Sequence, residues 1–418
     1  MQNKINSFLV IICAILIPWQ FYFNVFANKS ATIFFFYSFA LCLYLFLQKK
    51  IDIKILLEQK AFFILFALIA IFALFSDLKI EGLKYIYYFI IAFPVLLIFR
   101  SEIINKEKII SAYLWSSLPL ALLAITLFFA NEHKTQLYQL PFWSYLIEPD
   151  TLKDAITNPY AANAFAANRG GGVFLNTQDG AVFACINILL SIWLIINKRK
   201  KIYFISAIIW ILSLIAFGSR AGLIIFIVVA IFASILLFHK LKQKRMRKRY
   251  VLLPIFAAFF LLFSSILINQ RFYSAGLDQA INFNGRIKIW TSSIEVIKDN
   301  CVLGVGFDNN KWNNQYNNYA QKINAILSVP PHNIYLLIWA KIGVFGAIFL
   351  LAFILWNFKR ELLIYLQKDS NTYTLHLALT LIFLWIGLQG LTENLFLAEA
   401  RILASLFMLL GLNKNENT

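Results

Sequence analysis

The amino-acid sequence predicts an all-α polytopic membrane protein, and three observations support this fold class. Hydrophobic residues make up 61% of the 418 residues, which is more apolar surface than a water-soluble core could bury. Charged residues make up only 14%, and they lie in short tracts between apolar runs. Most of these runs approach the length of about 20 residues that a helix needs to cross a bilayer.

Twelve such runs predict about 12 transmembrane helices in a single membrane domain, residues 1–418. The stretch 202–238 is too long for one helix, so we expect a tight turn at Gly218-Ser219-Arg220-Ala221-Gly222. The first run shows no small-residue cleavage site, which predicts an anchored span and not a removed signal peptide. The predicted spans lie near 6–26, 31–48, 61–76, 84–99, 109–130, 173–196, 202–218, 222–238, 251–269, 333–356, 373–390 and 395–412.

The distribution of positive charge predicts the orientation of these helices. Lysine and arginine gather in alternate loops, at 49–60, 100–108, 198–201, 240–249 and 359–368. Cytoplasmic loops of membrane proteins carry this excess, so we expect both termini in the cytoplasm. The net charge of +18 does not indicate a nucleic-acid partner, because the basic tracts form no continuous basic face. A disulfide framework is not expected either, because three of the four cysteines lie inside apolar runs.

This orientation places two long polar segments outside. The first covers residues 131–172, and the second and main loop covers residues 270–332, between the ninth and tenth spans. Within the main loop, the stretch 286–299 carries Ile287, Trp290, Ile294 and Ile297 at helical spacing. The spacing predicts an amphipathic helix that lies against the membrane surface and roofs a cavity.

Three ionisable residues at the outer membrane edge are candidates for chemistry, because charge near hydrocarbon is costly to keep. Arg220 lies in the turn between two apolar spans, Arg286 begins the amphipathic helix, and His332 follows Pro330-Pro331 at the start of the tenth span. Guanidinium groups match the oxygens of a pyrophosphate, and an imidazole titrates near neutral pH and can accept a proton from an attacking hydroxyl. In a sugar transfer from a polyprenyl pyrophosphate, the arginines would offset the charge of the leaving group.

Each of these residues also has a structural interpretation. Arg220 could cap the helix hairpin and extend its charged end to the interface, as long cationic side chains do. Arg286 could be a solvated residue at a helix start, and His332 could be a helix N-terminal residue without chemistry.

Four further residues are supporting candidates: Arg169, Lys288, Asn333 and Lys341. Arg169 precedes three glycines, so either substrate binding or a flexible glycine loop explains it. Lys341 is one of the few charges within a span, where an ion pair with Glu393 or Glu399 and a cavity-facing role are alternatives.

Other reaction classes leave no motif in the sequence. The outer loops contain no Asp-x-Asp pair and no His/Cys cluster, so the sequence does not predict a metal site. No cofactor is expected. No glycine-rich phosphate loop of the nucleotide-hydrolase type is present, which argues against nucleotide-sugar chemistry.

Three sequence blocks resemble the O-antigen ligase family, part of the O-antigen ligase/polymerase superfamily. His332-Asn333, nine residues and then Gly343-Val344-Phe345-Gly346 resemble the family's His-[Asn/Ser/Gln]-x9-Gly-x-x-[Gly/Thr/Tyr] signature. Gly218–Gly222 is similar to the superfamily's Ser-Arg-Gly-type turn. The segment Asn284-Gly285-Arg286 with Trp290, followed by Gly304-Val305-Gly306, is similar to its periplasmic loop. The blocks occur in the family's order, and the twelve-span layout extends the resemblance over the whole chain.

The resemblance implies a GT-C-like, inverting and metal-independent glycosyltransferase in the inner membrane of a Gram-negative bacterium. Its donor would be a glycan linked to undecaprenyl pyrophosphate, and its acceptor would be a lipid A-core sugar hydroxyl. Membrane lipids would surround the protein. By position, His332 would be the catalytic base, and Arg220 and Arg286 would bind the donor pyrophosphate at the periplasmic face.

Two alternatives within the superfamily remain open, an O-antigen polymerase and a protein O-oligosaccharyltransferase, since only the acceptor differs. A third alternative is a transporter or lipid flippase, which twelve spans would fit. Against transport, the spans hold few central ionisable residues, and the polar candidates gather at one membrane face instead of the midplane.

Overall fold

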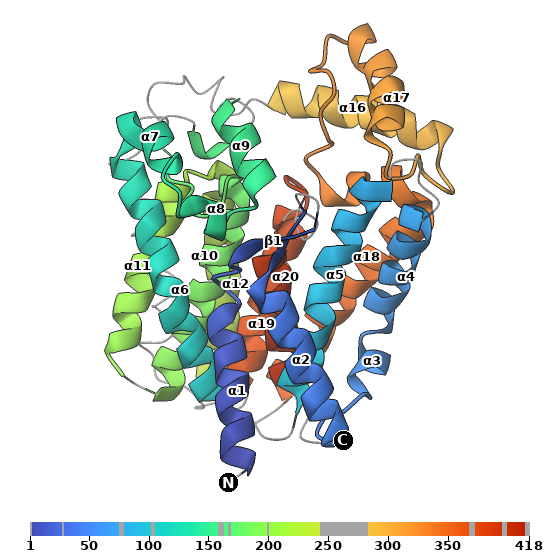
Figure 1. Ribbon diagram of the computed structural model, residues 1–418. Helices are drawn as coiled ribbons and strands as arrows, with labels where there is room; N and C mark the ends of the chain where they lie inside the picture. The colour runs from blue at the N-terminus through green and yellow to red at the C-terminus, as the bar shows by residue number, and fades with distance from the viewer. Residues whose placement is uncertain are drawn as a thin grey trace.

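The computed structural model describes residues 2–26, 29–74, 79–101, 105–157, 163–165, 169–198, 200–242, 283–367, 373–394 and 399–413. Long helices form the body of the molecule, and the first and last helices have their outer ends at the same end of it (Figure 1). The opposite end carries several short helices and a two-helix cap. The fold class predicted from the sequence, an all-α membrane protein, therefore agrees with the described structure.

Eleven of the twelve predicted spans correspond to described α-helices, and the ninth, 251–269, lies outside the described residues. Four of the helices, α6, α10, α12 and α18, are long and apolar enough to cross a membrane. The other seven are shorter apolar helices. The bounds are α1 Gln2–Leu16, α2 Ile33–Leu47, α4 Lys60–Leu74, α5 Lys79–Arg100, α6 Lys106–Phe129, α10 Thr177–Lys198, α11 Ile202–Phe217, α12 Arg220–Lys242, α18 Ile334–Gln367, α19 Tyr373–Gln389 and α20 Ala400–Leu412, with a short α3, Ile55–Glu58, before α4.

The first apolar run departs from the predicted span near 6–26, because its helix ends at Leu16. Pro18 follows within two residues, and proline cannot continue a helix. The chain then forms strand β1, Tyr22–Phe26, which pairs in antiparallel fashion with β2, Lys29–Thr32. Aromatic and β-branched residues favour this hairpin over a further helical turn.

The turn predicted inside the stretch 202–238 is confirmed. Helix α11 ends at Phe217, Gly218 takes a left-handed conformation with φ of 63°, and α12 begins at Arg220. Glycine adopts this conformation without the steric cost that a Cβ atom would add. The Ser219 Oγ accepts a hydrogen bond from the Gly222 amide (2.9 Å), which caps the start of α12.

The two polar segments predicted to lie outside occupy the same end of the molecule (Figure 1). The first contains η1 Asn131–His133, α7 Lys134–Tyr138, α8 Trp143–Leu146, α9 Pro149–Thr157 and η3 Asn163–Phe165. The second contains α16, Phe283–Asp299, and α17, Asn309–Lys322, which together form the cap. Residues 270–282 of the predicted main loop lie outside the described residues.

The amphipathic helix predicted at 286–299 is present as α16, but its packed face differs from the predicted one. Ile289, Val296 and Ile297 are buried in a small core shared with α17 and α18. Ile287 and Ile294, which belonged to the predicted apolar face, are exposed. Helix α16 therefore carries apolar residues on two faces. The packing of α17 decides which face is buried, and the sequence spacing alone did not show which one.

Helix α18 is broken at Gly343, where φ is 75° and ψ is −173°. A Cβ atom at this position would lie 1.8 Å from the Val302 carbonyl oxygen. The loop after α16 docks into the break, since the amides of Val305 and Gly306 donate to the carbonyls of Ala340 and Lys341 at 2.7 and 2.9 Å. The break thus ties the cap to the body of the molecule.

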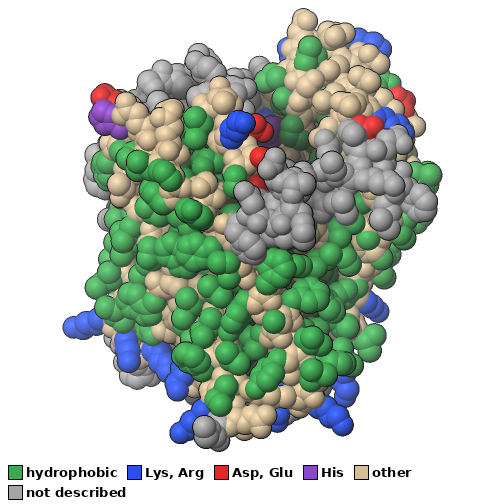
Figure 2. Space-filling model, viewed as in Figure 1, with side chains coloured by type: hydrophobic (Ala, Val, Ile, Leu, Met, Phe, Trp, Pro, Cys, Tyr) green, Lys and Arg blue, Asp and Glu red, His purple; other side chains and the backbone are tan. Residues whose placement is uncertain are grey.

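Figure 2 shows the charge distribution of one face. Hydrophobic side chains cover the middle of the molecule, and lysine and arginine side chains gather around the end where the chain begins and finishes. At the other end, acidic side chains are visible in a hollow beside the cap (Figure 2). An apolar middle with charged side chains at the ends is the pattern of a membrane protein.

Candidate functional site

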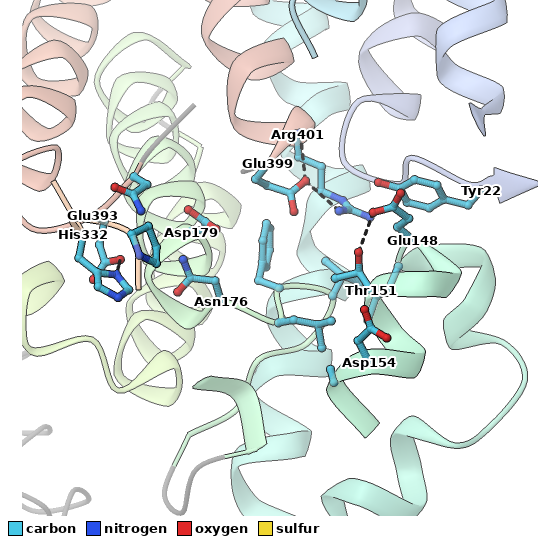
Figure 3. Close-up of a pocket in the computed structure, with 17 residues that line it drawn as sticks. Tyr22, Glu148, Thr151, Asp154, Asn176, Asp179, His332, Glu393, Glu399 and Arg401 are labelled. Atoms are coloured by element: carbon cyan, nitrogen blue, oxygen red, sulfur yellow. Dashed lines mark hydrogen bonds and ion pairs between the residues drawn. The ribbon is translucent and has the colours of Figure 1, made fainter. Parts of the chain in front are cut away.

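A cavity of about 450 Å³ opens at the end that carries the cap and the short helices. It is lined by side chains from β1, the segment between α8 and α9, α9, the start of α10, the segments before α18 and after α19, and the start of α20 (Figure 3). The lining residues are Tyr22, Ile147, Glu148, Thr151, Asp154, Ala155, Val173, Phe174, Leu175, Asn176, Asp179, Pro330, His332, Glu393, Asn394, Glu399 and Arg401.

The lining of this cavity is strongly acidic. It includes five carboxyl groups, those of Glu148, Asp154, Asp179, Glu393 and Glu399. The cationic lining residues are Arg401 and, when protonated, His332. A cavity with this balance repels an anion such as pyrophosphate, whereas carboxylates accept hydrogen bonds from the hydroxyl groups of a sugar.

Two of the three main candidates meet at one carboxylate that joins them. The Arg286 guanidinium donates from Nη2 to Glu393 Oε1 (3.1 Å) and from Nη1 to the Thr392 carbonyl (2.8 Å). The other carboxylate oxygen, Glu393 Oε2, lies 3.6 Å from His332 Nδ1. The Glu393 side chain is only 5% exposed, whereas His332 is 39% exposed and faces the cavity. The pair of His332 and Glu393 is visible at one side of Figure 3.

The local sequence fixes the position of His332. The Trp290 indole donates to the Pro331 carbonyl (3.0 Å), which holds the Pro-Pro-His turn against α16. His332 has a φ of 48°, an uncommon backbone conformation outside glycine. Such conformations persist only where the surroundings impose them, and they are frequent at functional sites. The imidazole is therefore placed by contacts from α16 and from the segment after α19.

Asn333 has a capping role. Its Oδ1 accepts hydrogen bonds from the amides of Tyr335 (3.0 Å) and Leu336 (3.1 Å) at the start of α18. Its own amide donates to Asn394 Oδ1 (3.1 Å), and the Ile334 amide donates to the Gly390 carbonyl (2.8 Å). These contacts anchor the start of α18 beside Glu393. They also explain why an asparagine follows the histidine in this sequence.

Arg220 lies at the same end of the molecule but is not among the residues that line the cavity. Its neighbour Ser219 donates to Gln178 Oε1, and Gln389 Nε2 donates to the same oxygen (3.2 Å). This chain of hydrogen bonds links the start of α12 to α10 and to the end of α19. Of the three main candidates, His332 lines the cavity, Arg286 is linked to it through Glu393, and Arg220 is not among the lining residues.

Arg169 stands beside the start of α10, where its Nη1 donates to Thr177 Oγ1 (3.2 Å). The three glycines that follow are packed tightly, so the flexible-loop interpretation is wrong. A Cβ atom on Gly170 would lie 1.9 Å from the Ala124 carbonyl oxygen, and the Gly170 amide donates to the Ala216 carbonyl (2.7 Å). Arg169 and Ser219, the residue before Arg220, thus both contact the first turn of α10.

Neither of the two supporting lysines lines the cavity: Lys288 lies on α16 of the cap, and Lys341 lies on α18 and contacts the cap. Lys341 is buried, its Nζ donates to Asn309 Oδ1 (3.2 Å), and the same atom lies 5.7 Å from the Phe307 ring centroid. The predicted alternatives for it were an ion pair with Glu393 or Glu399 and a cavity-facing role, and Lys341 is not among the residues that line the cavity. Lys288 is exposed and donates to the Asn324 carbonyl (3.3 Å).

Asp179, Glu399 and Arg401 are among the charged lining residues that sequence reasoning did not select. Asp179 is buried at the start of α10, and Glu399 caps α20 through the Arg401 amide. Arg401 is buried and donates to Glu399 Oε1 (2.9 Å), to the Pro18 carbonyl (2.9 Å) and to the Leu146 carbonyl. Charge at the edge of an apolar run was the signal that selected Arg220, and it would have selected these residues as well. Within the described ranges, no group of three His, Cys, Asp or Glu side chains is arranged to hold a metal ion.

Comparison with known protein families supports the resemblance to the O-antigen ligase family. Residues 205–351 match the family model described as O-antigen ligase. Over this segment the chain is similar to the O-antigen ligase family. The match contains all three sequence blocks, the Gly218–Gly222 turn, the Asn284–Gly306 segment and the His332–Gly346 signature. No curated protein matches the chain.

Within the family segment, the structure gives the signature a physical meaning. His332 stands at the start of α18, and Gly343 forms the break that receives Val302. The nine residues between His332-Asn333 and Gly343 set the distance from the cavity to the docking point of the cap. The matched segment is therefore similar to the O-antigen ligase/polymerase superfamily, whose members are glycosyltransferase-like.

Proposed function

We propose that the protein is an O-antigen ligase that transfers a glycan from undecaprenyl pyrophosphate to a lipid A-core sugar hydroxyl. The observation that carries the proposal is the His332 imidazole, which faces the cavity while the Glu393 carboxylate, 3.6 Å behind it, also holds Arg286. A GT-C-like architecture, an inner-membrane location and a periplasmic site are parts of the same proposal.

The cavity is proposed to bind the acceptor. Its carboxylates accept hydrogen bonds from sugar hydroxyls, and the Phe174 and Tyr22 rings offer apolar surface to a sugar face. The same carboxylates disfavour a phosphate group inside the cavity. We therefore expect the accepting sugar to be neutral or amine-bearing, with its phosphate groups outside the cavity.

The donor pyrophosphate is proposed to lie on the arginine side of His332. Arg286 uses two of its guanidinium N–H groups on Thr392 and Glu393, of the five that an arginine carries. Arg169 contacts the start of α10, and Gln178 of the same helix joins Ser219, the neighbour of Arg220, to Gln389 at the end of α19. In this arrangement His332 stands between an acidic acceptor pocket and a cationic donor region.

The proposed reaction is a single displacement with inversion. The acceptor hydroxyl oxygen forms a bond to the anomeric carbon of the donor, and the bond from that carbon to the pyrophosphate oxygen breaks with its electron pair. The hydroxyl proton passes to His332 Nε2, because Nδ1 faces Glu393. The Glu393 carboxylate orients the ring and stabilises the charge that it gains, and the arginines offset the charge of the released pyrophosphate.

Reconstitution of the purified protein with undecaprenyl-pyrophosphate glycan tests this proposal. Three acceptors separate the functions: rough-core lipopolysaccharide, a second lipid-linked glycan and a pilin-like protein. We expect lipopolysaccharide to be modified. Elongation of the lipid-linked glycan alone would identify a polymerase, and glycan on the pilin-like protein would identify a protein transferase.

The roles of the site residues are tested in the same system. His332→Ala and Arg286→Ala should each abolish transfer in protein that still inserts and accumulates. His133→Ala and Lys288→Gln are matched controls, since both residues lie at the same end but do not line the cavity. Transfer at the wild-type rate by either site variant would reject the assigned role of that residue.

A further inference from the structure

A second cavity, of about 420 Å³, lies between α4 and α18, far from the cavity that holds His332. Its walls are formed on one side by Ala61 and Ile64, and on the other by Phe349, Leu355 and Trp356. We call it the α4–α18 groove. Trp356 is 56% exposed and Leu355 is also exposed, so the groove opens on the apolar surface that faces lipid. Its occupant must therefore bring an apolar chain.

The polar groups on the floor of this groove satisfy one another. Gln59 Nε2 donates to Asn357 Oδ1 and Asn357 Nδ2 donates to Gln59 Oε1, both at 3.1 Å. Asn357 Nδ2 also donates to the Phe353 carbonyl (2.9 Å). Because these buried amides are paired, the floor does not call for a polar ligand. What remains for an occupant is apolar contact.

The mouth of the groove is basic. Lys60 begins α4 and Lys359 lies in the last part of α18, and both side chains are exposed. No salt bridge to either ammonium group is present among the described residues. The nearby Glu58 carboxylate is bound by Arg100 (2.6 Å) and by Arg360 (3.5 Å), so its negative charge is offset within the protein.

We propose that the α4–α18 groove binds an anionic phospholipid of the leaflet at the basic end of the molecule. An acyl chain occupies the apolar walls, and the phosphate lies between Lys60 and Lys359. An apolar groove that ends in two lysines fits a molecule with a long hydrocarbon chain and a negative head group. The phospholipid joins α4 to α18, the helix that begins two residues after His332. This inference does not depend on the proposed glycan transfer.

Lipid binding by the purified full-length chain in detergent tests the proposal. Retained lipid is counted by native mass spectrometry during titration with phosphatidylglycerol or with phosphatidylethanolamine of the same acyl chains. Quenching of tryptophan fluorescence by lipids with brominated chains reports contact with Trp356, and Trp356→Phe gives the part of the signal that comes from this residue. We expect one phosphatidylglycerol to bind more tightly than phosphatidylethanolamine.

Charge and groove volume are tested by separate variants. The double variant Lys60→Gln/Lys359→Gln should bind phosphatidylglycerol about 30-fold more weakly. Each lysine near an anionic lipid contributes about 1 kcal/mol of attraction, and the loss of about 2 kcal/mol corresponds to this change in affinity. Lys108→Gln/Lys201→Gln removes two exposed lysines of the same end outside the groove and should have little effect. Ala352→Trp fills the groove and should displace both lipids.

Three outcomes would overturn the proposal. Equal affinity for the two lipids would remove the role of the lysines. An equal loss in both lysine double variants would show general charge attraction instead of a site. Displacement of bound phosphatidylglycerol by inorganic phosphate alone would identify an anion site without a lipid chain.

Discussion

A single substitution of Glu393 should lower the rate of catalysis much more than the stability of the fold. Glu393→Gln keeps the shape of the side chain and one oxygen that can accept from Arg286 Nη2, but it removes the negative charge 3.6 Å from His332 Nδ1. The arginine side chain is 33% exposed, so solvent screens the lost ion pair. We expect a loss of about 1 kcal/mol in the free energy of unfolding, below the 3–5 kcal/mol of a fully buried pair.

The effect on the transfer rate should be much larger than the effect on stability. A positioned general base contributes roughly 10²–10⁴-fold to a rate, and His332 relies on Glu393 for its orientation and for stabilisation of its positive form. We therefore expect Glu393→Gln to lower kcat by about 10²-fold or more, with a small change in the KM for the acceptor. Initial rates of glycan transfer in proteoliposomes, at matched amounts of folded protein, measure this.

A double-substitution cycle then distinguishes a shared role from two independent ones. If Glu393 acts through His332, the variant His332→Ala/Glu393→Gln should be no slower than His332→Ala alone. Glu295→Gln is the matched control, because Glu295 forms an exposed ion pair with Lys298 (2.7 Å) on α16, away from the cavity. Fully additive losses, or a Glu393→Gln rate within threefold of wild type, would refute the reasoning.

Three further predictions concern the cap and the cavity. Gly343→Ala should lower the free energy of unfolding by more than about 3 kcal/mol, because φ is 75° and the new Cβ would collide with backbone. Gly285→Ala is the control and should be tolerated, because no atom lies within 4 Å of its Cβ. Thermal unfolding of the two variants measures the difference. Burial raises the pKa of Tyr316 to about 12, so the stability from its neutral form is complete below pH 10 and is lost as pH rises from 10 through 12. Tyr316→Phe should cost about 1 kcal/mol at pH 7, from the lost hydrogen bond to the Ile326 carbonyl (3.0 Å), and flatten the alkaline unfolding profile between pH 9 and 12. Asp154→Asn removes one negative charge from the cavity, so a phosphorylated acceptor sugar should be repelled less. We expect its KM, divided by the KM of a neutral acceptor sugar, to fall by about fivefold. An unchanged ratio would argue against acceptor binding in this cavity.

Tertiary contacts decided which candidate residues form a site. Arg286 and Glu393 are 107 positions apart, and the pair forms because α16 of the cap lies across the end of α19. No local pattern encodes such a contact, since it depends on how the cap docks at Gly343. The same docking buries one apolar face of α16 and leaves the face with Ile287 exposed, although both faces have helical spacing.

The sequence by itself determined the features that depend on composition and local geometry. Long apolar runs with few charges can be stable only as helices in lipid, and a glycine at position 218 allows the left-handed turn that separates α11 from α12. The signature that begins at His332 also indicated the similarity to the O-antigen ligase family before any coordinates. The acidic cavity, the separation of Arg220 from its lining and the bridge through Glu393 required the tertiary structure, because each is a distance between side chains on helices remote in sequence.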